Sequence, residues 1–221
     1  MIDARQIPLA LYVHLPWCVR KCPYCDFNSH AVPAGGIAEQ AYVTALQRDL
    51  EHAATGAAGR EIVSVFFGGG TPSLFSPAAI GRVLEHARGL LPFAADVEVT
   101  LEANPGTVEH GRFSEYAAAG VNRVSLGAQS FDDERLAVLG RIHGANDTAR
   151  AVDELRAAGI DNFNLDLMYA LPGQDLRGAL TDLERAIELG PTHLSHYQLT
   201  LEPDSPFEKR PPPRLPDDEL A

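Results

Sequence analysis

A chain of 221 residues, 45% hydrophobic and 22% charged, has the length of one large domain or one domain with an appendage and the composition of a globular protein. Its 18 Lys and Arg against 30 Asp and Glu give a formal net charge of −12, which argues against binding nucleic acid or anionic membranes through a basic patch. No apolar stretch is long enough for a transmembrane segment, and the first residues do not resemble a signal peptide, so we expect a cytoplasmic location.

Strands and helices are predicted to alternate along almost the whole chain. The strands predicted from β-branched, aromatic and other apolar segments are residues 9–15, 61–67, 97–101, 123–128, 162–170 and 193–201. The helices predicted between them are residues 38–54, 76–91, 109–119 and 176–189, with two short helices split near residues 140–146. Ser76-Pro77 is typical of a helix start, whereas Gly120 and Gly190 are typical of helix ends.

This alternation predicts the fold class. Units of about 30–35 residues, each with one strand and one helix, indicate parallel βαβ units with right-handed crossovers. The chain has no Rossmann signature, so we interpret it as an α/β fold with a partial (β/α)6 barrel rather than a doubly wound sheet. In a barrel, the chemistry lies at the carboxyl ends of the strands, on the loops that follow them.

The C-terminal residues differ in composition from the rest of the chain. Prolines at 211–213, with Pro206 and Pro216 nearby, predict an extended connector. Residues 216–220 then have the pattern of a first helical turn, with acidic residues at its positive end. We therefore expect a core domain at residues 1–205, followed at 206–221 by a Pro-rich connector and the start of a missing C-terminal domain.

All three cysteines lie in one loop after the first predicted strand. Cys18, Cys22 and Cys25 form a C-x3-C-x2-C motif within eight residues, which does not suit a disulfide framework. Thiolates hold iron–sulfur clusters, and three of them bound to a [4Fe–4S] cluster leave one iron open to a small molecule. An open coordination position is typical of catalytic rather than structural metal sites.

The same loop allows other interpretations. A structural zinc site would take a fourth ligand from His14, Asp26 or His30. The Cys22-Pro-Tyr-Cys25 segment by itself matches the dithiol of glutaredoxin-like redox proteins. Three unrelated buried thiols are the plainest alternative. The ligand count, the third cysteine and the long β/α chain favour the cluster.

Further candidate residues follow the predicted strands. Gly69, Gly70 and Thr71 belong to a GGGTP segment after the second strand, and three adjacent glycines exceed what a turn requires, so we expect backbone there to approach a ligand closely. Glu102 and Gln129 end the third and fourth strands, and Asp166 lies within the fifth. Polar groups on successive strands of one barrel predict a shared site at its rim.

In combination these motifs resemble the radical S-adenosylmethionine (radical SAM) superfamily. From about residue 9 to 208 the chain is similar, block after block, to the oxygen-independent coproporphyrinogen III oxidase-like proteins. The blocks are YVHLPWCVRKCPYCDFNSH, VFFGGGTPSL, VTLEANPG, RVSLGAQSF, LGRIH, NLDLMYALPGQ and HLSHYQLTLEPDSPF. The CxxxCxxC motif alone would indicate only the superfamily.

The resemblance implies a radical-SAM-type partial barrel and a set of cofactor contacts. The three cysteines would hold a [4Fe–4S] cluster whose open iron chelates S-adenosyl-L-methionine (SAM), and the GGGTP loop would hold the amino group of SAM. The further SAM contacts implied are Tyr12, Tyr24, Glu102, Gln129, Arg141 and Asp166. An electron from a reductant such as a flavodoxin or ferredoxin would cleave SAM to methionine and a 5′-deoxyadenosyl radical.

One position separates two groups within this family. The oxidases proper carry a further cysteine two residues after the third ligand, where this chain has Phe27. This departure favours the HemW-type heme chaperones, which bind heme and transfer it to an acceptor protein, here unknown. Coproporphyrinogen III oxidase activity in porphyrin biosynthesis is the alternative. The heme-binding element of the chaperones lies in a C-terminal region that these residues do not include, so heme is implied for the full-length protein only.

Overall fold

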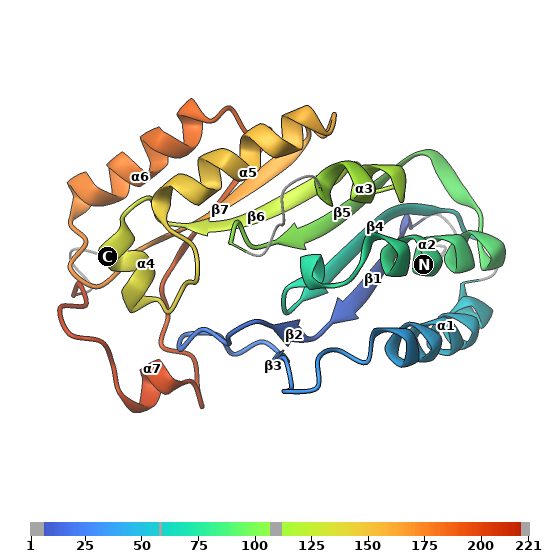
Figure 1. Ribbon diagram of the computed structural model, residues 1–221, viewed down its shortest axis with the longest axis horizontal. Coiled ribbons are helices and arrows are strands. Elements are labelled where there is room, and N and C mark those ends of the chain that lie inside the picture. The colour runs from blue at the N-terminus through green and yellow to red at the C-terminus, as the bar shows by residue number, and fades with distance from the viewer. Residues whose placement is uncertain (1–6, 58, 107–111, 218–221) are drawn as a thin grey trace.

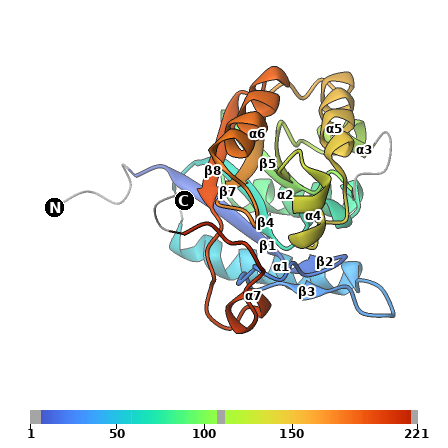
Figure 2. The same cartoon turned by 90° about the vertical axis from the view of Figure 1, so that its left-hand side faces the viewer.

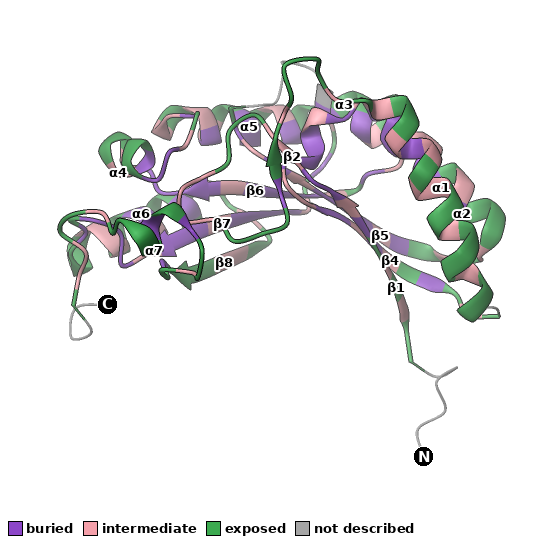
Figure 3. Ribbon diagram, turned by 90° about the horizontal axis from the view of Figure 1, so that it is seen from below, coloured by how far each residue is buried: buried purple, intermediate pink, exposed green. Residues whose placement is uncertain are grey.

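The structure is a computed structural model and describes residues 7–57, 59–106 and 112–217. Six parallel strands form one sheet in the order β1-β4-β5-β6-β7-β8, which is also their order along the chain. Their bounds are β1 Leu9–Leu15, β4 Ile62–Gly69, β5 Phe93–Ala103, β6 Arg123–Gln129, β7 Phe163–Tyr169 and β8 His193–Gln198. Each crossover thus adds a strand on the same side, and β1 and β8 are the two edges (Figure 3; the whole chain is shown in Figure 1). This winding confirms the predicted α/β partial (β/α)6 barrel.

Helices cover one side of the sheet, and Figure 3 shows α1, α2, α3 and α5 along it. The longer helices are α1 Glu39–Gly56, α2 Pro77–Leu90, α3 Arg112–Ala118, α5 Ala145–Ala157 and α6 Leu176–Glu188. Short helical elements are the 3-10 helix Pro72–Leu74, α4 Asp133–Val138 and α7 Pro206–Lys209. The predicted helix start at Ser76 is confirmed, because its hydroxyl accepts a hydrogen bond from the amide of Ala79. None of the described helices is long and apolar enough to cross a membrane.

The two faces of the strands serve different purposes. Successive side chains of a strand point to opposite faces, and one set packs against the helices. Fully buried members of that set include Phe67 on β4, Leu101 on β5 and Leu165 on β7. The alternate positions carry polar groups instead, among them Glu102 on β5 and Asp166 on β7. The hydrophobic core therefore fixes the strands while their other face remains free for a site.

Several predicted boundaries were wrong. Strand β5 begins at Phe93 rather than at residue 97, and β8 ends at Gln198 rather than at residue 201. Two short strands, β2 (Trp17–Cys18) and β3 (His30–Ala31), pair in parallel within the cysteine loop, where none was predicted. Pairs of two residues are too short to leave a periodic pattern in the sequence. The start of the helix predicted at 109–119 and most of the turn predicted at 216–220 lie outside the described residues.

The start of the predicted extended connector is helical. Ser205 caps α7 by accepting a hydrogen bond from the amide of Glu208, and Pro206 occupies the first helical position. Phe207 is buried, and its amide donates to the carbonyl of Pro23 in the cysteine loop. Figures 1 and 2 show α7 beside that loop. This segment therefore contributes to the same structural unit as the cysteines.

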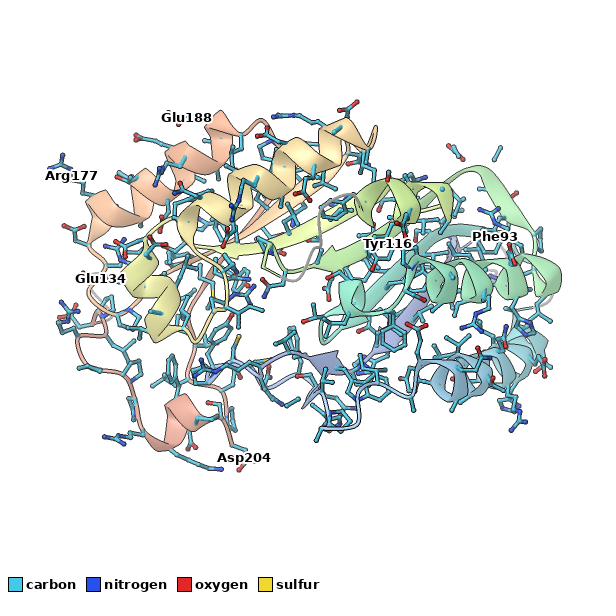
Figure 4. The ribbon with its side chains drawn as sticks, viewed as in Figure 1. Phe93, Tyr116, Glu134, Arg177, Glu188 and Asp204 are labelled. Carbon is cyan, nitrogen blue, oxygen red and sulfur yellow. The ribbon has the colours of Figure 1, made fainter. Side chains whose placement is uncertain are left out.

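One buried tyrosine ties α3 to the segment that enters α2. The hydroxyl of Tyr116 lies near the carbonyl oxygens of Ser73, at 2.9 Å, and Phe75, at 2.6 Å (Figure 4). The ring is fully buried, so water cannot replace the lost hydrogen bond in a variant.

Replacing Tyr116 by Phe should lower the free energy of unfolding by about 1–2 kcal/mol, because two buried carbonyls lose their hydroxyl partner. Urea unfolding followed by circular dichroism measures the change. Tyr42→Phe is a graded control, because that half-buried hydroxyl has a single acceptor, the carbonyl of His14, and its loss should cost less. Equal losses in the two variants would contradict this account.

Candidate functional site

A cavity of about 530 Å³ lies at the carboxyl ends of the strands. Its wall combines the cysteine loop with the ends of β4, β5, β6, β7 and β8. The predicted site residues that line it are Cys18, Cys22, Tyr24, Cys25, Gly69, Gly70, Thr71, Glu102, Gln129, Arg141 and Asp166. Residues that are 148 positions apart in the sequence thus meet around one space, as expected for the rim of a barrel.

The three cysteines are free thiols, and each is half-buried. The pairing of β2 with β3 holds the first of them in place, since the amide of Val32 donates to the carbonyl of Cys18 over 2.9 Å. The third cysteine, Cys25, lies 3.9 Å from the hydroxyl of Ser29. Burial raises the pKa of the Cys25 thiol, and the ammonium of Lys21 is among the groups that oppose this rise.

The thiols do not converge on one point. Within the described ranges, no three Cys, His, Asp or Glu side chains are grouped so as to hold a single metal ion. A four-iron cluster makes a different demand, because each thiolate ligates a separate iron. Three half-buried thiols along one wall of a cavity suit that demand.

The glycines after β4 permit a close approach between two backbone segments. Gly69 has a φ of +119°, and a Cβ there would lie 2.5 Å from the ring of His14. A Cβ on Gly70 would lie 2.6 Å from the carbonyl oxygen of Trp17. In this arrangement the amides of Gly70 and Thr71 donate to Leu15 and Trp17, over 2.8 and 2.7 Å. The glycines are therefore required by packing as well as by any ligand.

Two carboxylates share the cavity. The carboxylate of Glu102 accepts a hydrogen bond from the amide of Gly69 at 3.1 Å. Burial raises the pKa of Glu102 to about 7, and the charge of Asp166 adds to the effect. Asp166 accepts hydrogen bonds from Ser125 at 3.0 Å and from the amide nitrogen of Asn164 at 2.8 Å. Burial also raises the pKa of Asp166. A cationic or hydroxyl-bearing ligand would satisfy both acids.

Gln129 reaches the cavity because the backbone changes direction at that residue. Its φ is +66°, a conformation that is uncommon for residues other than glycine, and the β6–β7 register shifts between Leu126 and Gln129. The side-chain carbonyl of Gln129 accepts a hydrogen bond from the hydroxyl of Tyr197 at 2.7 Å. Burial raises the pKa of Tyr197, which keeps this hydroxyl a donor. Strained backbone of this kind clusters at binding sites.

Arg141 connects the strand ends to the cysteine loop. Its guanidinium donates to the carbonyl of Gly127 at 2.7 Å and lies 3.6 Å from the sulfur of Cys22. The neighbouring hydroxyl of Tyr24 has a raised pKa, for which burial is the main cause. A half-buried guanidinium without a counter-charge is costly, so its placement beside a thiol and a cavity indicates an anionic ligand or thiolate there.

Tyr12 is the one predicted site residue that does not line the cavity. Its side chain is 56% exposed, and its ring stacks on Phe66 with a centroid distance of 6.2 Å. The hydroxyl lies 3.1 Å from Nδ1 of His14. Burial and the charge of Glu102 raise the pKa of Tyr12. Its exposure and its absence from the cavity lining place the residue beside the site rather than in its wall.

Several residues of the cavity wall were not predicted from the sequence. These include Asn104, Ser125, Met168, Ser195, Tyr197 and Gln198. The two-residue alternation along β7 and β8 is the signal that places Met168, Ser195 and Tyr197 on the same face as Asp166. The segment after β8 also contributes Thr200 and Glu202.

Comparisons with known proteins agree with this geometry. The family model of the radical SAM superfamily matches residues 12–200. The chain is 55% identical over 212 residues to the heme chaperone HemW of Escherichia coli (strain K12), covering 96% of this chain and 56% of that protein. HemW of Haemophilus influenzae is 51% identical over 216 residues, with the same coverages of 96% and 56%. The chain spans about half the length of these curated relatives.

A solved structure has the same fold. The coproporphyrinogen III oxidase HemN of Escherichia coli, described as a radical SAM enzyme, matches with a TM-score of 0.87 and 30% identity. The match covers 98% of this chain and 50% of that one. SuiB of Streptococcus suis, solved bound to S-adenosylmethionine, is more distant, with a TM-score of 0.63 and 16% identity over 95% of this chain and 43% of that one, and supports the fold alone.

The raised pKa of Glu102 makes a prediction about stability. The folded carboxyl keeps its proton up to a pH of about 7, whereas the unfolded chain loses it near the ordinary value of 4.5. The folded state therefore binds more protons between these values, and this group makes stability fall as pH rises. Glu102→Gln removes this pH dependence. Between pH 5 and pH 8 the free energy of unfolding of the variant should therefore rise by about 2–3 kcal/mol relative to that of the parent chain. Urea unfolding of the ligand-free chain at both pH values measures it, and parallel pH profiles would contradict it.

Proposed function

Because the chain belongs to the radical SAM superfamily, we propose that its cysteine loop holds a [4Fe–4S] cluster, that its cavity binds SAM, and that the protein acts as a heme chaperone. The observation that carries this proposal is the meeting of three thiols with the Gly69–Thr71 loop and two half-buried carboxylates around one cavity. Each component alone has a plainer explanation. Together they form a wall with sulfur ligands on one side and polar groups on the other.

The cysteine loop suits the cluster. Cys18, Cys22 and Cys25 are free and half-buried, and they line the same cavity, so each would bind one iron of the cluster and leave the fourth iron without a thiolate ligand. When bound and reduced, the cluster supplies the electron that cleaves SAM to methionine and a 5′-deoxyadenosyl radical. The donor of this electron is a reductant of the flavodoxin or ferredoxin kind. Arg141 stabilises negative charge on Cys22 through its contact with that sulfur.

The remaining wall suits SAM. The amides of residues 69–71 already donate hydrogen bonds within the protein, to Glu102, Leu15 and Trp17. The loop therefore offers a ligand its backbone carbonyl oxygens, which accept hydrogen bonds from the amino group of SAM. Glu102 and Asp166 are acceptors for ribose hydroxyls and oppose the positive sulfonium. Arg141 and Gln129 complete the polar part of the wall, and Tyr24 adds an aromatic surface.

Heme transfer is favoured over porphyrinogen oxidation by the residue after the cluster loop. Phe27 is 61% exposed and lines the cavity, and it stands at the position where the oxidases carry a further cysteine. The curated relatives at 55% and 51% identity are heme chaperones. In this function the protein binds heme and passes it to an acceptor protein. The structural likeness to the oxidase HemN keeps coproporphyrinogen III oxidation as the second candidate.

The cluster assignment predicts that Cys22→Ala abolishes cluster binding. After anaerobic reconstitution, the parent chain should contain about four iron and four sulfide per chain, and the variant less than one-tenth of that, because the cube loses one of three protein ligands. Iron and acid-labile sulfide analysis gives the numbers. Ser29→Ala is the matched control, since it removes only a contact to Cys25 of 3.9 Å, and it should retain its cluster. Zinc without sulfide in the parent chain would overturn the assignment.

The choice between the two functions rests on heme and coproporphyrinogen III. The reconstituted protein, at the full length of its curated relatives, should bind heme stoichiometrically and leave coproporphyrinogen III unchanged in the presence of SAM and a reductant. Absorbance titration with heme and chromatography of the porphyrins measure the two properties. Conversion of coproporphyrinogen III to protoporphyrinogen IX would overturn the chaperone assignment while leaving the cluster and SAM in place.

A further inference from the structure

The turn after Cys25 is held by side chains of residues that precede it in the sequence. Residues 27–29 present three successive backbone carbonyls, and each lies at hydrogen-bond distance from a side-chain nitrogen. Nζ of Lys21 donates to the carbonyls of Phe27, at 2.9 Å, and Ser29, at 3.2 Å, and Nε2 of His14 lies 2.8 Å from the carbonyl of Asn28. The position of Cys25 thus depends on a residue between the first two cysteines.

Lys21 is unusual in this chain. The sequence contains only two lysines, Lys21 and Lys209, within a net charge of −12. Lys209 lies on α7, 3.9 Å from a carboxylate oxygen of Asp204, so an acid partly offsets its charge. Lys21 instead donates to neutral carbonyl oxygens, which orient its ammonium without cancelling its charge.

The side chain of Lys21 is exposed, and its two hydrogen bonds hold the ammonium beside the cysteine loop, where it acts on any charge that the cysteines hold. Lys21 lies inside the Cys18–Cys25 loop, next to Cys22 in sequence, and its two hydrogen bonds bend its side chain toward the turn that follows Cys25. Net charge near an iron–sulfur cluster is one of the properties that set its reduction potential. Reduction adds one negative charge, so a nearby cation stabilises the reduced form more than the oxidised form.

We propose that Lys21 is a positioning residue of the cysteine loop, and that its fixed charge favours the reduced state of the cluster the loop holds. This role rests on the proposed cluster but not on SAM cleavage or heme transfer. A flexible side chain held by two hydrogen bonds places the charge at a defined point, and its effect adds to that of Arg141 beside Cys22 in a protein whose net charge of −12 disfavours reduction.

The test compares Lys21→Met, which removes the charge and the donor, with Lys21→Arg, which keeps both. Lys209→Met is the matched control, because it removes the other lysine from a helix outside the loop. Each protein is reconstituted anaerobically, assayed for iron and sulfide, and titrated with a reductant while electron paramagnetic resonance reports the reduced cluster. At a fixed ambient potential, the ratio of reduced to oxidised cluster in Lys21→Met should fall about tenfold, equivalent to about 59 mV for one electron. Lys21→Arg and Lys209→Met should match the parent.

The outcomes separate this inference from the proposed function. A full cluster in Lys21→Met with the parent's midpoint potential would overturn the role of Lys21, as would Lys21→Arg behaving like Lys21→Met. If Lys21→Met and Lys21→Gln both fail to retain iron and sulfide while Lys21→Arg retains them, the cation is required to hold the loop, which supports the positioning role. A parent protein without iron and sulfide would instead overturn the cluster itself.

Discussion

The site depends on the close approach of two backbone segments at the ends of β1 and β4. The amides of Gly70 and Thr71 donate to the carbonyls of Leu15 and Trp17, which lead directly into Cys18. A side chain at Gly69 or Gly70 would collide with His14 or with this backbone. The glycines therefore place the cysteine loop against the strand ends, and through that contact the thiols come to share a cavity with polar groups on four other strands.

The cavity contains groups that lower the stability of the folded protein when no ligand is bound. Glu102 and Asp166 are both half-buried acids with raised pKa values, Arg141 is a half-buried cation, and Gln129 has a left-handed backbone. None of these features contributes to the hydrophobic core, which lies on the opposite face of the strands. Such groups persist because the well-packed sheet and helices stabilise the fold independently of them. A ligand with positive charge and hydroxyl groups would offset the cost of the two acids, and an anionic group or thiolate would offset that of Arg141.

Much of the fold was predictable because the physical signals are local. The apolar segments that form β1, β4, β6 and β7 and the Ser-Pro start of α2 are patterns of a few neighbouring residues. The predictions failed where neighbours in space decide the outcome. The β2–β3 pair exists because the two sides of the cysteine loop meet, and α7 lies where an extended connector was predicted because Phe207 is buried against the loop.

The sequence by itself determined the chemistry: three thiols at a cluster-binding spacing, a glycine-rich loop, and acidic and amide residues at successive strand ends. These features are readable because residue type and spacing are properties of the chain. Only the tertiary structure decided which groups share the cavity, since the side-chain direction depends on strand register and backbone angle. It turned Gln129 inward, left Tyr12 outside the wall and brought Ser195 and Tyr197 into it. It also placed the ammonium of Lys21 against the carbonyls of the turn after Cys25, a contact that no spacing in the sequence indicates.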